Sequence, residues 1–474
     1  MLNCEDWVVP GVVCRYGQQR RTPVEAGGTL YGLATAAIII AGFLLTSRIL
    51  RMRLLKILPA ALALALAAPF SSLAVAAPTE IDLSHQLDEE RAERLEKLVE
   101  RFNAQQKEYQ VRLVRRVQGD APKDLNLVTR EEQARFVAAK ANFKPLHQVM
   151  KEANLPLDGG KLAPELRVGL SDAQGNLFAL PIALSTPVLF INKTAFRKAG
   201  LDPEKPPKTW AETQQAADKL FDAGSTCPYT TSWPAWVHID NLSSWNGVEV
   251  ADAKGKLNFN GLVQVKHTAM LTTWAKARFF IYFGRRDEAD NRFAAGECGM
   301  LTTSSSFYGT LNEKGKLDTG VSALPYHDDV PGTPQQTLAG GASLWVGAGQ
   351  KPAEYKGVAQ FVNFLMEPDL QVELSAAAGF LPMTSAARAA AGSKLLKADV
   401  AGLNVAYKQL QGPGALRTLR VSEIERVRII AEEELEAAWA GKTPAKQALD
   451  VAVQRGNLVM PGAPAPAAAA RKKK

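Results

Sequence analysis

The amino-acid sequence predicts an α/β protein in which two lobes are joined by extended strands. Its 474 residues exceed what one hydrophobic core usually serves, so two or three domains are expected. From Ile81 onward, short strand-like runs alternate with amphipathic helical patterns, which is typical of a sheet covered by helices. The stretch 181–196, PIALSTPVLFINKTAF, is extended around Pro187 and is expected to carry the chain from one lobe into the other.

The first lobe is expected to begin with strands at 81–84 and 111–114. Two helices are expected further along, at about 131–140 and 146–153. Between the two strands, apolar residues recur at i, i+3, i+4 and i+7 and so form one face of another helix. These residues are Leu95, Leu98, Val99 and Phe102.

Two stretches are expected to cross between the lobes. In the first, Ser185 and Thr186 end an apolar run and are expected to face the gap, ahead of a buried strand at 188–191. An ordinary buried strand with a polar turn explains the same pattern. In the second, QQTLAGGASLW, the paired Gly340 and Gly341 let the backbone come close to another group.

Several helices carry clear boundary signals. Thr209 and Glu212 have the spacing of a capping box, and the helix they open is expected to end near Gly224. Pro368 opens another helix, which Gly379 stops. Further helices are expected at about 358–365, 421–439 and 443–455.

The N-terminal region has the parts of a secretory signal peptide. These are a short basic segment that starts at Met52, an apolar run at 57–68, and small residues ending at Ala76, after which we expect cleavage. The preceding segment, 1–51, holds an uncharged apolar run at 30–45. That run is either a transmembrane helix at the lower length limit or part of an upstream extension. We favour the extension, with translation starting at Met52.

The charge of the chain is concentrated at its two ends. Of the formal net charge of +8, four positive charges come from residues 1–76 and four from the terminal segment 471–474. Residues 77–470 are therefore balanced, and nothing in them resembles the basic footprint of a nucleic-acid-binding protein. We interpret the basic tail as a solvated end.

Two of the four cysteines, Cys227 and Cys298, belong to the exported part of the chain. In an oxidising compartment such a pair is typical of a disulfide. The bridge would close 71 positions and contribute about 4 kcal/mol on the chain-entropy model. Two buried free thiols are the alternative.

Enzyme signatures are missing from the sequence. It contains no GxSxG elbow, no phosphate-binding P-loop, no HExxH and no Cys/His metal cluster, and its five histidines are scattered. Enzymatic activity is therefore disfavoured, and neither a cofactor nor a metal site is expected.

Two clusters point instead to ligand binding. Trp233, Trp236 and Trp245 fall within thirteen positions, and flat indole faces stack well against sugar or polyol C–H surfaces. Three core tryptophans under a loop are the alternative. A hydroxyl cluster at 302–306, TTSSS, suits a polar, anionic or sugar ligand, although taken alone it is more typical of a serine-rich turn.

Seven stretches, in unbroken order from Ser185 to Asn457, carry a family resemblance. They are STPVLFINKTAFRKAGLDPEKPPKTW, WPAW with WNGVEV, VKHTAML, GECGM, GGASLWV, GFLPMT and RVRIIAEEELEAAWAGKTPAKQALDVAVQRGN. The chain resembles the extracellular solute-binding proteins (family 1) of ABC importers, and more closely the periplasmic sn-glycerol-3-phosphate-binding proteins of Ugp-type importers. The resemblance implies a type II periplasmic-binding-protein fold, in which hinge strands join two lobes around a ligand cleft.

This fold implies a layout in which the chain passes repeatedly between the lobes. The expected segments are an extension at 1–51, the signal peptide at 52–76, lobe 1 at 77–184 and 336–382, lobe 2 at 185–335, its C-terminal helices at 383–458, and a disordered tail at 459–474.

The resemblance also assigns ligand contacts. It implies a phosphate-binding arginine at Arg428, serine hydroxyls at Ser185 and Ser304, and a backbone amide at Gly341. The tryptophans that cover the glycerol part fall on Trp233 and Trp236. A guanidinium gives phosphate a fixed fork of donors, so the set is chemically coherent.

The first lobe departs from the family pattern. The strand at 111–114 leads almost directly to Gly119, so a ligand-binding tyrosine of the family has no counterpart. The family's glutamate falls on Thr129, and the tyrosine of its G-Y-L-P stretch is Phe380. Each lost hydrogen-bonding partner typically costs about 1–3 kcal/mol of free energy, which is enough to change which ligand the cleft binds best.

The resemblance implies a monomeric periplasmic receptor that binds glycerol-3-phosphate or a related phosphorylated polyol or glycerophosphodiester and delivers it to membrane permease subunits. No covalent chemistry, cofactor or nucleic-acid partner is implied. The alternatives are a sugar or oligosaccharide receptor, a sensor whose ligand site has degraded, and an exported glycosidase.

Overall fold

The computed structural model describes the chain from residue 77 to residue 460, with several gaps. The extension, the signal peptide and the part of the tail after residue 460 lie outside the described residues, as does the apolar run at 30–45. The described residues are 77–87, 89–117, 119–129, 132–157, 161–162, 166, 170–172, 174–314, 317–395, 401–410, 421 and 423–460, all within one compact unit.

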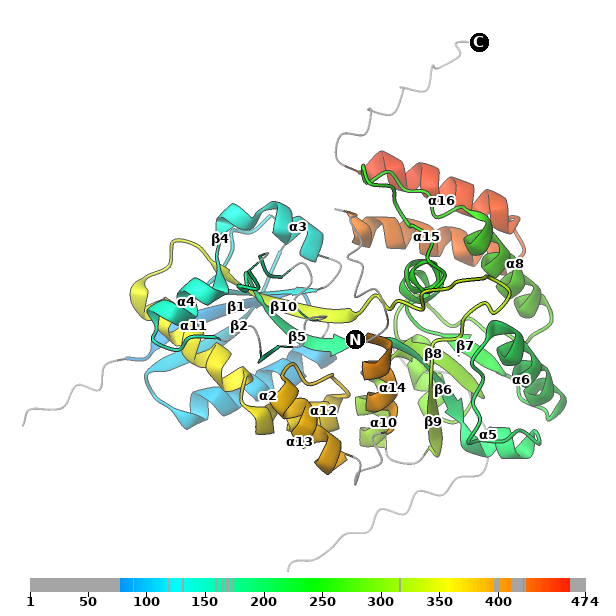
Figure 1. Ribbon diagram of the computed structural model, residues 1–474, viewed down its shortest axis with the longest axis horizontal. Helices are drawn as coiled ribbons and strands as arrows, with labels where there is room; N and C mark the ends of the chain where they lie inside the picture. Colours follow the sequence, from blue (N-terminus) through cyan, green and yellow to red (C-terminus); the bar gives the residue numbers. More distant parts are fainter. Residues whose placement is uncertain are drawn as a thin grey trace, which may run out of the picture. The chain divides into compact units, whose positions relative to one another are not determined.

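The first lobe is built on a sheet that combines the start of the chain with a strand from much later (Figure 1). Its order is β2-β1-β3-β10-β4, and β5 also pairs with β10. β1 runs parallel to β2 and β3, whereas β10 is antiparallel to β3, β4 and β5. The strands are β1 (Thr79–His85), β2 (Tyr109–Arg115), β3 (Leu125–Thr129), β4 (Phe143–Lys144), β5 (Leu180–Ser185) and β10 (Gly340–Gly347).

Helices from both halves of the chain pack on this sheet. α2 packs against β2, α11 packs against β1 and α4, and α13 packs on α12. Their apolar faces give the first lobe its core, as the spacing from Leu95 to Phe102 predicts. The helices are α2 (Glu89–Gln105), α3 (Gln133–Ala138), the short 3-10 helix η1 (Lys140–Asn142), α4 (Leu146–Glu152), α11 (Pro352–Leu365), α12 (Pro368–Ala378) and α13 (Ser385–Leu395).

The second lobe has a smaller sheet in the order β7-β8-β6-β9. β6 is antiparallel to β8 and β9, while β7 runs parallel to β8. The strands are β6 (Pro187–Asn192), β7 (Tyr229–Thr231), β8 (Met300–Ser304) and β9 (Thr319–Ala323). The helices are α5 (Lys193–Lys198), α6 (Trp210–Asp222), the π-helix η4 (Trp236–Asn241), α7 (Leu242–Trp245), α8 (Leu262–Lys276), α9 (Glu288–Ala294), α10 (Phe307–Lys314), α14 (Ala401–Leu410), α15 (Ile424–Trp439) and α16 (Ala445–Val459).

Local hydrogen bonds and glycine conformations lie at the predicted helix boundaries. Thr209 Oγ1 accepts a hydrogen bond from the Glu212 amide at 3.1 Å, and Glu212 Oε2 accepts from the Thr209 amide at 3.2 Å, so the capping box is confirmed. Gly224 and Gly379 both adopt left-handed φ, at 86° and 65°, just beyond α6 and α12. Polar and glycine signals therefore mark these ends correctly.

One residue separates the two sheets at the first crossing. β5 ends at Ser185 in the first sheet, and β6 begins at Pro187 in the second. Thr186 between them is fully buried, and its hydroxyl accepts a hydrogen bond from Gln409 Nε2 of α14 at 3.0 Å. The expectation that Thr186 faces the gap is therefore wrong, because α14 covers it.

The second crossing depends on Gly341. Its φ is 119°, in the region that favours glycine, and the register between β10 and β5 shifts between Gly340 and Ala342. A Cβ at Gly341 would lie 2.6 Å from the carbonyl oxygen of Ala183 and 3.0 Å from the Cα of Leu184. Both neighbours are backbone atoms, so β10 can lie this close to β5 only with glycine at this position.

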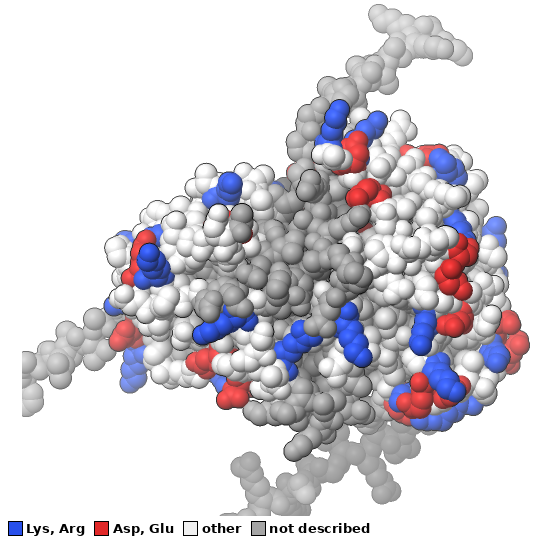
Figure 2. All heavy atoms as spheres, viewed as in Figure 1, with Lys and Arg blue, Asp and Glu red and all other residues white. Residues whose placement is uncertain are grey.

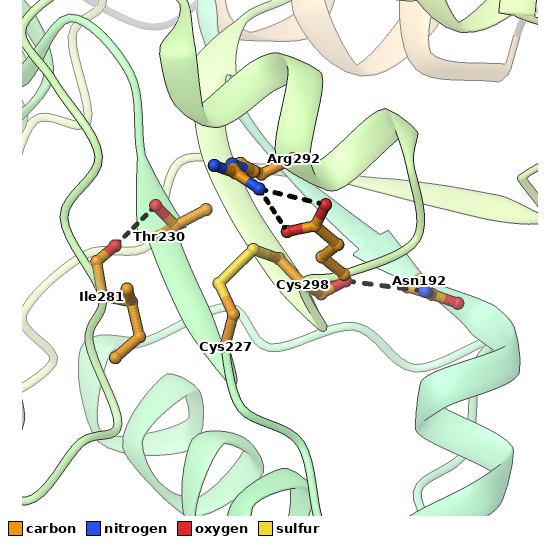
Figure 3. Close-up of a disulfide and its surroundings, with 7 residues drawn as sticks. Asn192, Cys227, Thr230, Ile281, Arg292 and Cys298 are labelled. Atoms are coloured by element: carbon orange, nitrogen blue, oxygen red, sulfur yellow. Dashed lines mark hydrogen bonds and ion pairs between the residues drawn. A yellow bond between two sulfur atoms is a disulfide. The ribbon is translucent and has the colours of Figure 1, made fainter. Parts of the chain in front are cut away.

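The predicted disulfide between Cys227 and Cys298 is present (Figure 3). The two Cα atoms are 4.6 Å apart, and both residues are buried. The bridge joins the segment before β7 to the segment before β8, two strands that are parallel neighbours. It closes the loop that contains η4, α8 and α9.

Three of the histidines that are scattered along the sequence meet in the core of the second lobe. Nδ1 of His238 lies 2.9 Å from Nε2 of His267, and Nδ1 of His267 lies 3.1 Å from Nε2 of His327. The ring of Trp210 packs against His267 with centroids 4.7 Å apart. The nitrogens pair with one another, and in the described ranges no three His, Cys, Asp or Glu side chains are arranged to hold a metal ion.

Burial keeps this histidine chain neutral. It lowers the pKa of His238 to about 3 and that of His327 to about 4. The pKa of His267 also lies well below its usual value, because burial and the neighbouring imidazoles disfavour its charged form. An unfolded chain takes up these protons near pH 6.5, so acid favours the unfolded state.

Replacing His238 with Gln is expected to reduce the acid sensitivity of the protein. Because the folded state resists protonation of this imidazole, its removal should recover up to about 2 kcal/mol of the stability lost between about pH 6.5 and about pH 5. Urea unfolding at several pH values measures the difference, and His147→Gln, outside the chain of histidines, is the control. Equal pH slopes for the wild type and His238→Gln would contradict the expectation.

Replacing Gly341 with Ala is expected to destabilise the protein by at least about 2 kcal/mol, because the new Cβ meets backbone atoms in an unfavourable φ region. Gly349→Ala is the matched control, since Gly349 also has a positive φ, of 81°, but no heavy atom within 4 Å of an added Cβ. We expect a loss of only about 1 kcal/mol there. Denaturant unfolding that gave the same loss for both variants would refute the close approach.

Candidate functional site

The predicted site residues of the first lobe lie at one edge of its sheet. β5 ends at Ser185, which is paired with Gly340 at the start of β10. β3 ends at Thr129, which is paired with Ala342. The register therefore brings Ser185, Gly341 and Thr129 to the same edge, where α/β proteins commonly bind ligands.

The second sheet places Ser304 beside this edge. Ser304 ends β8 and pairs with Pro187, and the amide of Ser305 donates to the carbonyl of Thr186 at 2.8 Å. The hydroxyl of Ser304 lies 2.8 Å from that of Ser306. Ser304 is thus paired with the residue that lies two positions after Ser185 in the chain.

Phe380 lies at the same crossing. It directly precedes Leu381, whose amide donates to the carbonyl of Leu184 at 2.9 Å. Its side chain is partly exposed. The structure therefore brings Phe380 close to the end of β5, although its ring can offer no hydrogen bond.

Trp236 and Ser185 flank the start of β10. A Cβ placed at Gly340 would lie 3.1 Å from Ser185 Oγ and 3.1 Å from the indole ring of Trp236. The indole nitrogen of Trp236 donates to the carbonyl of Leu338 at 3.2 Å, which fixes the ring. The indole ring of Trp236 and the hydroxyl of Ser185 therefore both lie against Gly340 at the crossing.

Trp233 has a different environment from Trp236. Guanidinium groups lie near its ring, that of Arg91 at 5.0 Å and that of Arg286 at 5.5 Å from the ring centre. Arg91 comes from α2 in the first lobe and also lies 3.7 Å from Asp287 of the second lobe. Trp233 thus takes part in contacts between the lobes, and its contact with a ligand stays a prediction. Trp245 packs in the core, where its indole nitrogen donates to Thr337.

Arg428 is held by the carboxylate of Asp240, which no sequence motif indicates. Its Nε and Nη2 atoms lie 2.7 Å and 2.6 Å from Oδ2 of Asp240. Only 12% of the Arg428 side chain and 2% of the Asp240 side chain are exposed. Asp240 lies in the π-helix η4, four residues after Trp236, so the same short segment positions the indole and orients the guanidinium.

A carboxylate also lies at the first-lobe edge, three residues after Thr129. Oε2 of Glu132 accepts a hydrogen bond from the Thr129 amide at 3.0 Å, and its Oε1 accepts from Arg116 at 2.7 Å and from Arg135 at 3.3 Å. Arg116 also donates to Ser84 Oγ. The T-x-x-E spacing, typical of a capping box, is the sequence signal that could have identified Glu132.

Contacts between charged side chains join the lobes. Arg135 of α3 lies 3.9 Å from Glu425 at the start of α15, the helix that carries Arg428. This contact places the N-terminal end of α15 close to the first lobe, whereas the Arg91 contacts join α2 to Trp233 and Asp287 of the second lobe. Side chains of both charge signs are spread over the described surface on the face shown in Figure 2, in line with the balanced composition.

A separate pocket of about 450 Å³ lies between α5 and α6. Phe196, Leu201, Lys208 and Glu212 are among its lining residues, and none of the predicted ligand residues belongs to it. Both positive and negative side chains line this pocket, and it does not contribute to the site at the crossing.

The comparisons with known proteins agree with this architecture. Residues 97–403 match the family model described as "Bacterial extracellular solute-binding protein". The chain is 37% identical over 409 residues to the sn-glycerol-3-phosphate-binding periplasmic protein UgpB of Pectobacterium atrosepticum, covering 81% of this chain and 92% of that protein. It is 36% identical over 434 residues to UgpB of Escherichia coli O6:K15:H31, covering 86% and 98%.

Solved structures show the same fold at lower identity. UgpB from Mycobacterium tuberculosis, in complex with glycerophosphocholine, is 19% identical with a TM-score of 0.67, over 80% of this chain and 98% of that one. Maltose-bound MalE3 from T. maritima is also 19% identical, with a TM-score of 0.65, over 81% and 100%. The predicted two-lobe type II fold is thereby confirmed.

Within the described part of the chain, no helix has the length and apolar character needed to span a membrane. The relatives are substrate-binding components of ABC importers, which bind small molecules and deliver them to permease subunits without catalysing a reaction. A two-lobe fold, a polar edge where the lobes meet, and this extent of identity lead to one conclusion: the chain belongs to the bacterial extracellular solute-binding protein family and is a non-enzymatic binding component of an ABC importer.

Proposed function

We propose that this protein binds glycerol-3-phosphate or a related phosphorylated polyol or glycerophosphodiester in the periplasm and delivers it to its membrane permease. The observation that carries the proposal is the buried, oriented guanidinium of Arg428 beside the segment that also supplies Trp236. The UgpB relatives are named for binding sn-glycerol-3-phosphate, and one solved neighbour holds glycerophosphocholine.

The chemistry of the crossing suits a phosphate ester. Arg428 would bind the phosphate, with Asp240 holding the guanidinium in one orientation. The hydroxyls of Ser185 and Ser304 and the amide of Gly341 would add neutral donors. The indole of Trp236 would cover the carbon chain of the ligand, as flat apolar faces do in polyol sites.

Ligand binding would act through the closure of the lobes. The contacts of Arg91 and Arg135 already join first-lobe helices to the second lobe. A ligand that touches both lobes would favour the closed form over the open one by its differential affinity, and the permease would recognise that form. We propose a monomer without a nucleic-acid partner, exported by the signal peptide at 52–76.

Calorimetry with glycerol-3-phosphate, a glycerophosphodiester and unphosphorylated sugars tests the proposal. We expect the phosphorylated ligands to bind and the sugars not to compete. Preference for the unphosphorylated sugars would favour the oligosaccharide receptor instead.

Arg428→Ala is expected to weaken binding of the phosphorylated ligand by about 10- to 100-fold, since hydrogen bonds to charged groups contribute about 1.5–3 kcal/mol. The double variant Arg428→Ala with Asp240→Asn avoids leaving a buried carboxylate unpaired and guards against unfolding. Arg197→Ala, which breaks an exposed ion pair with Asp318, is the matched control. Unchanged affinity in folded Arg428→Ala protein would remove Arg428 from the site.

A further inference from the structure

One face of α15 carries three ionisable residues at intervals of one turn, namely Arg428, Glu432 and Glu436. The outer two have partners. Arg428 is paired with Asp240, and Glu436 accepts hydrogen bonds from Arg285 at 2.8 and 2.6 Å. The hydroxyl of Tyr282 adds a further bond to Glu436 at 2.9 Å.

Glu432, between them, has a buried carboxylate oxygen without a hydrogen-bond partner. The residue is only 2% exposed, and its Oε2 atom is enclosed and unpaired. Burial raises the pKa of Glu432 to about 7, against the opposing attraction of Arg286, Arg285 and Arg428. Buried polar atoms almost always have a partner, so an unpaired carboxylate oxygen calls for a functional explanation.

The surroundings of Glu432 place it within the proposed binding region. Arg428 lies one turn away on the same helix. Arg286, the charge that acts on Glu432 most strongly, lies against the ring of Trp233. Glu432 is therefore one turn from the guanidinium proposed to bind phosphate and near Arg286, which contacts a tryptophan of the Ser232–Gly247 stretch.

We propose that Glu432 is a ligand-binding residue that accepts a hydrogen bond from a hydroxyl of the polyol whose phosphate is bound by Arg428. This inference rests on the proposed function and adds the contact that recognises the polyol end of the ligand. Residues one turn apart are separated by about 6 Å along a helix, and a three-carbon chain with its terminal oxygens spans a similar length. One helix would thus recognise both ends of the ligand.

Such a contact would shift hydroxyl recognition toward the second lobe. Thr129 and Phe380 at the first-lobe edge offer less hydrogen bonding than a carboxylate and a phenol would, and Glu132 is already engaged by two arginines. A carboxylate oxygen of Glu432 is a strong acceptor for a hydroxyl donor. The affinity of the cleft for the polyol would then depend on α15 more than on the first lobe.

Two ligands that differ only in their hydroxyls separate this contact from phosphate binding. Glycerol-3-phosphate has two free hydroxyls, and propyl phosphate has the same carbon chain with none. In calorimetry, Glu432→Ala is expected to weaken glycerol-3-phosphate about tenfold and to leave propyl phosphate unchanged, because only the first ligand has a hydroxyl to donate. Glu432→Gln, which keeps an acceptor oxygen, should recover part of the affinity. Arg428→Ala should weaken both ligands alike.

Glu434→Gln is the matched control, since Glu434 lies on the same helix and pairs with Arg455. Thermal unfolding of each variant shows whether it is folded. If the wild type binds neither phosphate ester, this inference fails, and if it also binds no glycerophosphodiester, the proposed function fails with it. If the wild type binds glycerol-3-phosphate but Glu432→Ala affects both ligands equally or neither, the inference alone is overturned.

Discussion

The close approach of β10 to β5 is the constraint on which the site depends. At Gly341 the two backbones leave no room for a side chain, and this contact brings a strand from late in the chain into the first sheet. Because β5 continues into β6 after a single residue, the same contact places Ser185 next to the second sheet. The edge where both lobes meet is therefore determined by main-chain packing, and the side chains that we propose as ligand contacts are attached to it.

Charge pairing then orients the polar groups around that edge. Arg428 is held by Asp240, and Glu132 accepts hydrogen bonds from both Arg116 and Arg135. Breaking one member of such a buried pair leaves an uncompensated charge, so these pairs restrict the geometry more than they add to stability. The π-helix that supplies Asp240 also carries Trp236, whose ring is fixed by its hydrogen bond to Leu338, so one segment holds parts of both proposed ligand contacts.

Local signals predicted much of the fold. Capping residues and left-handed glycines gave the ends of α6 and α12, and apolar spacing gave the buried face of α2, because these features depend on neighbours in the sequence. The partners of Arg428 and Glu132 and the meeting of His238 with His267 were missed, since they depend on tertiary packing that no local pattern encodes. Thr186 was misread for the same reason, because the helix that covers it lies more than 200 residues away. The proposed ligand residues came from the family resemblance, which did not assign Asp240 or Glu432.

The disulfide between Cys227 and Cys298 encloses much of the second lobe's share of the site. Trp233, Trp236 and Asp240 all lie within the 71 positions that it closes. When this part of the lobe unfolds locally, the disulfide keeps the enclosed segment in a closed loop. The unfolded segment then has fewer conformations available to it before it packs again. The disulfide therefore limits how far the segment that carries these three residues can depart from its packed conformation.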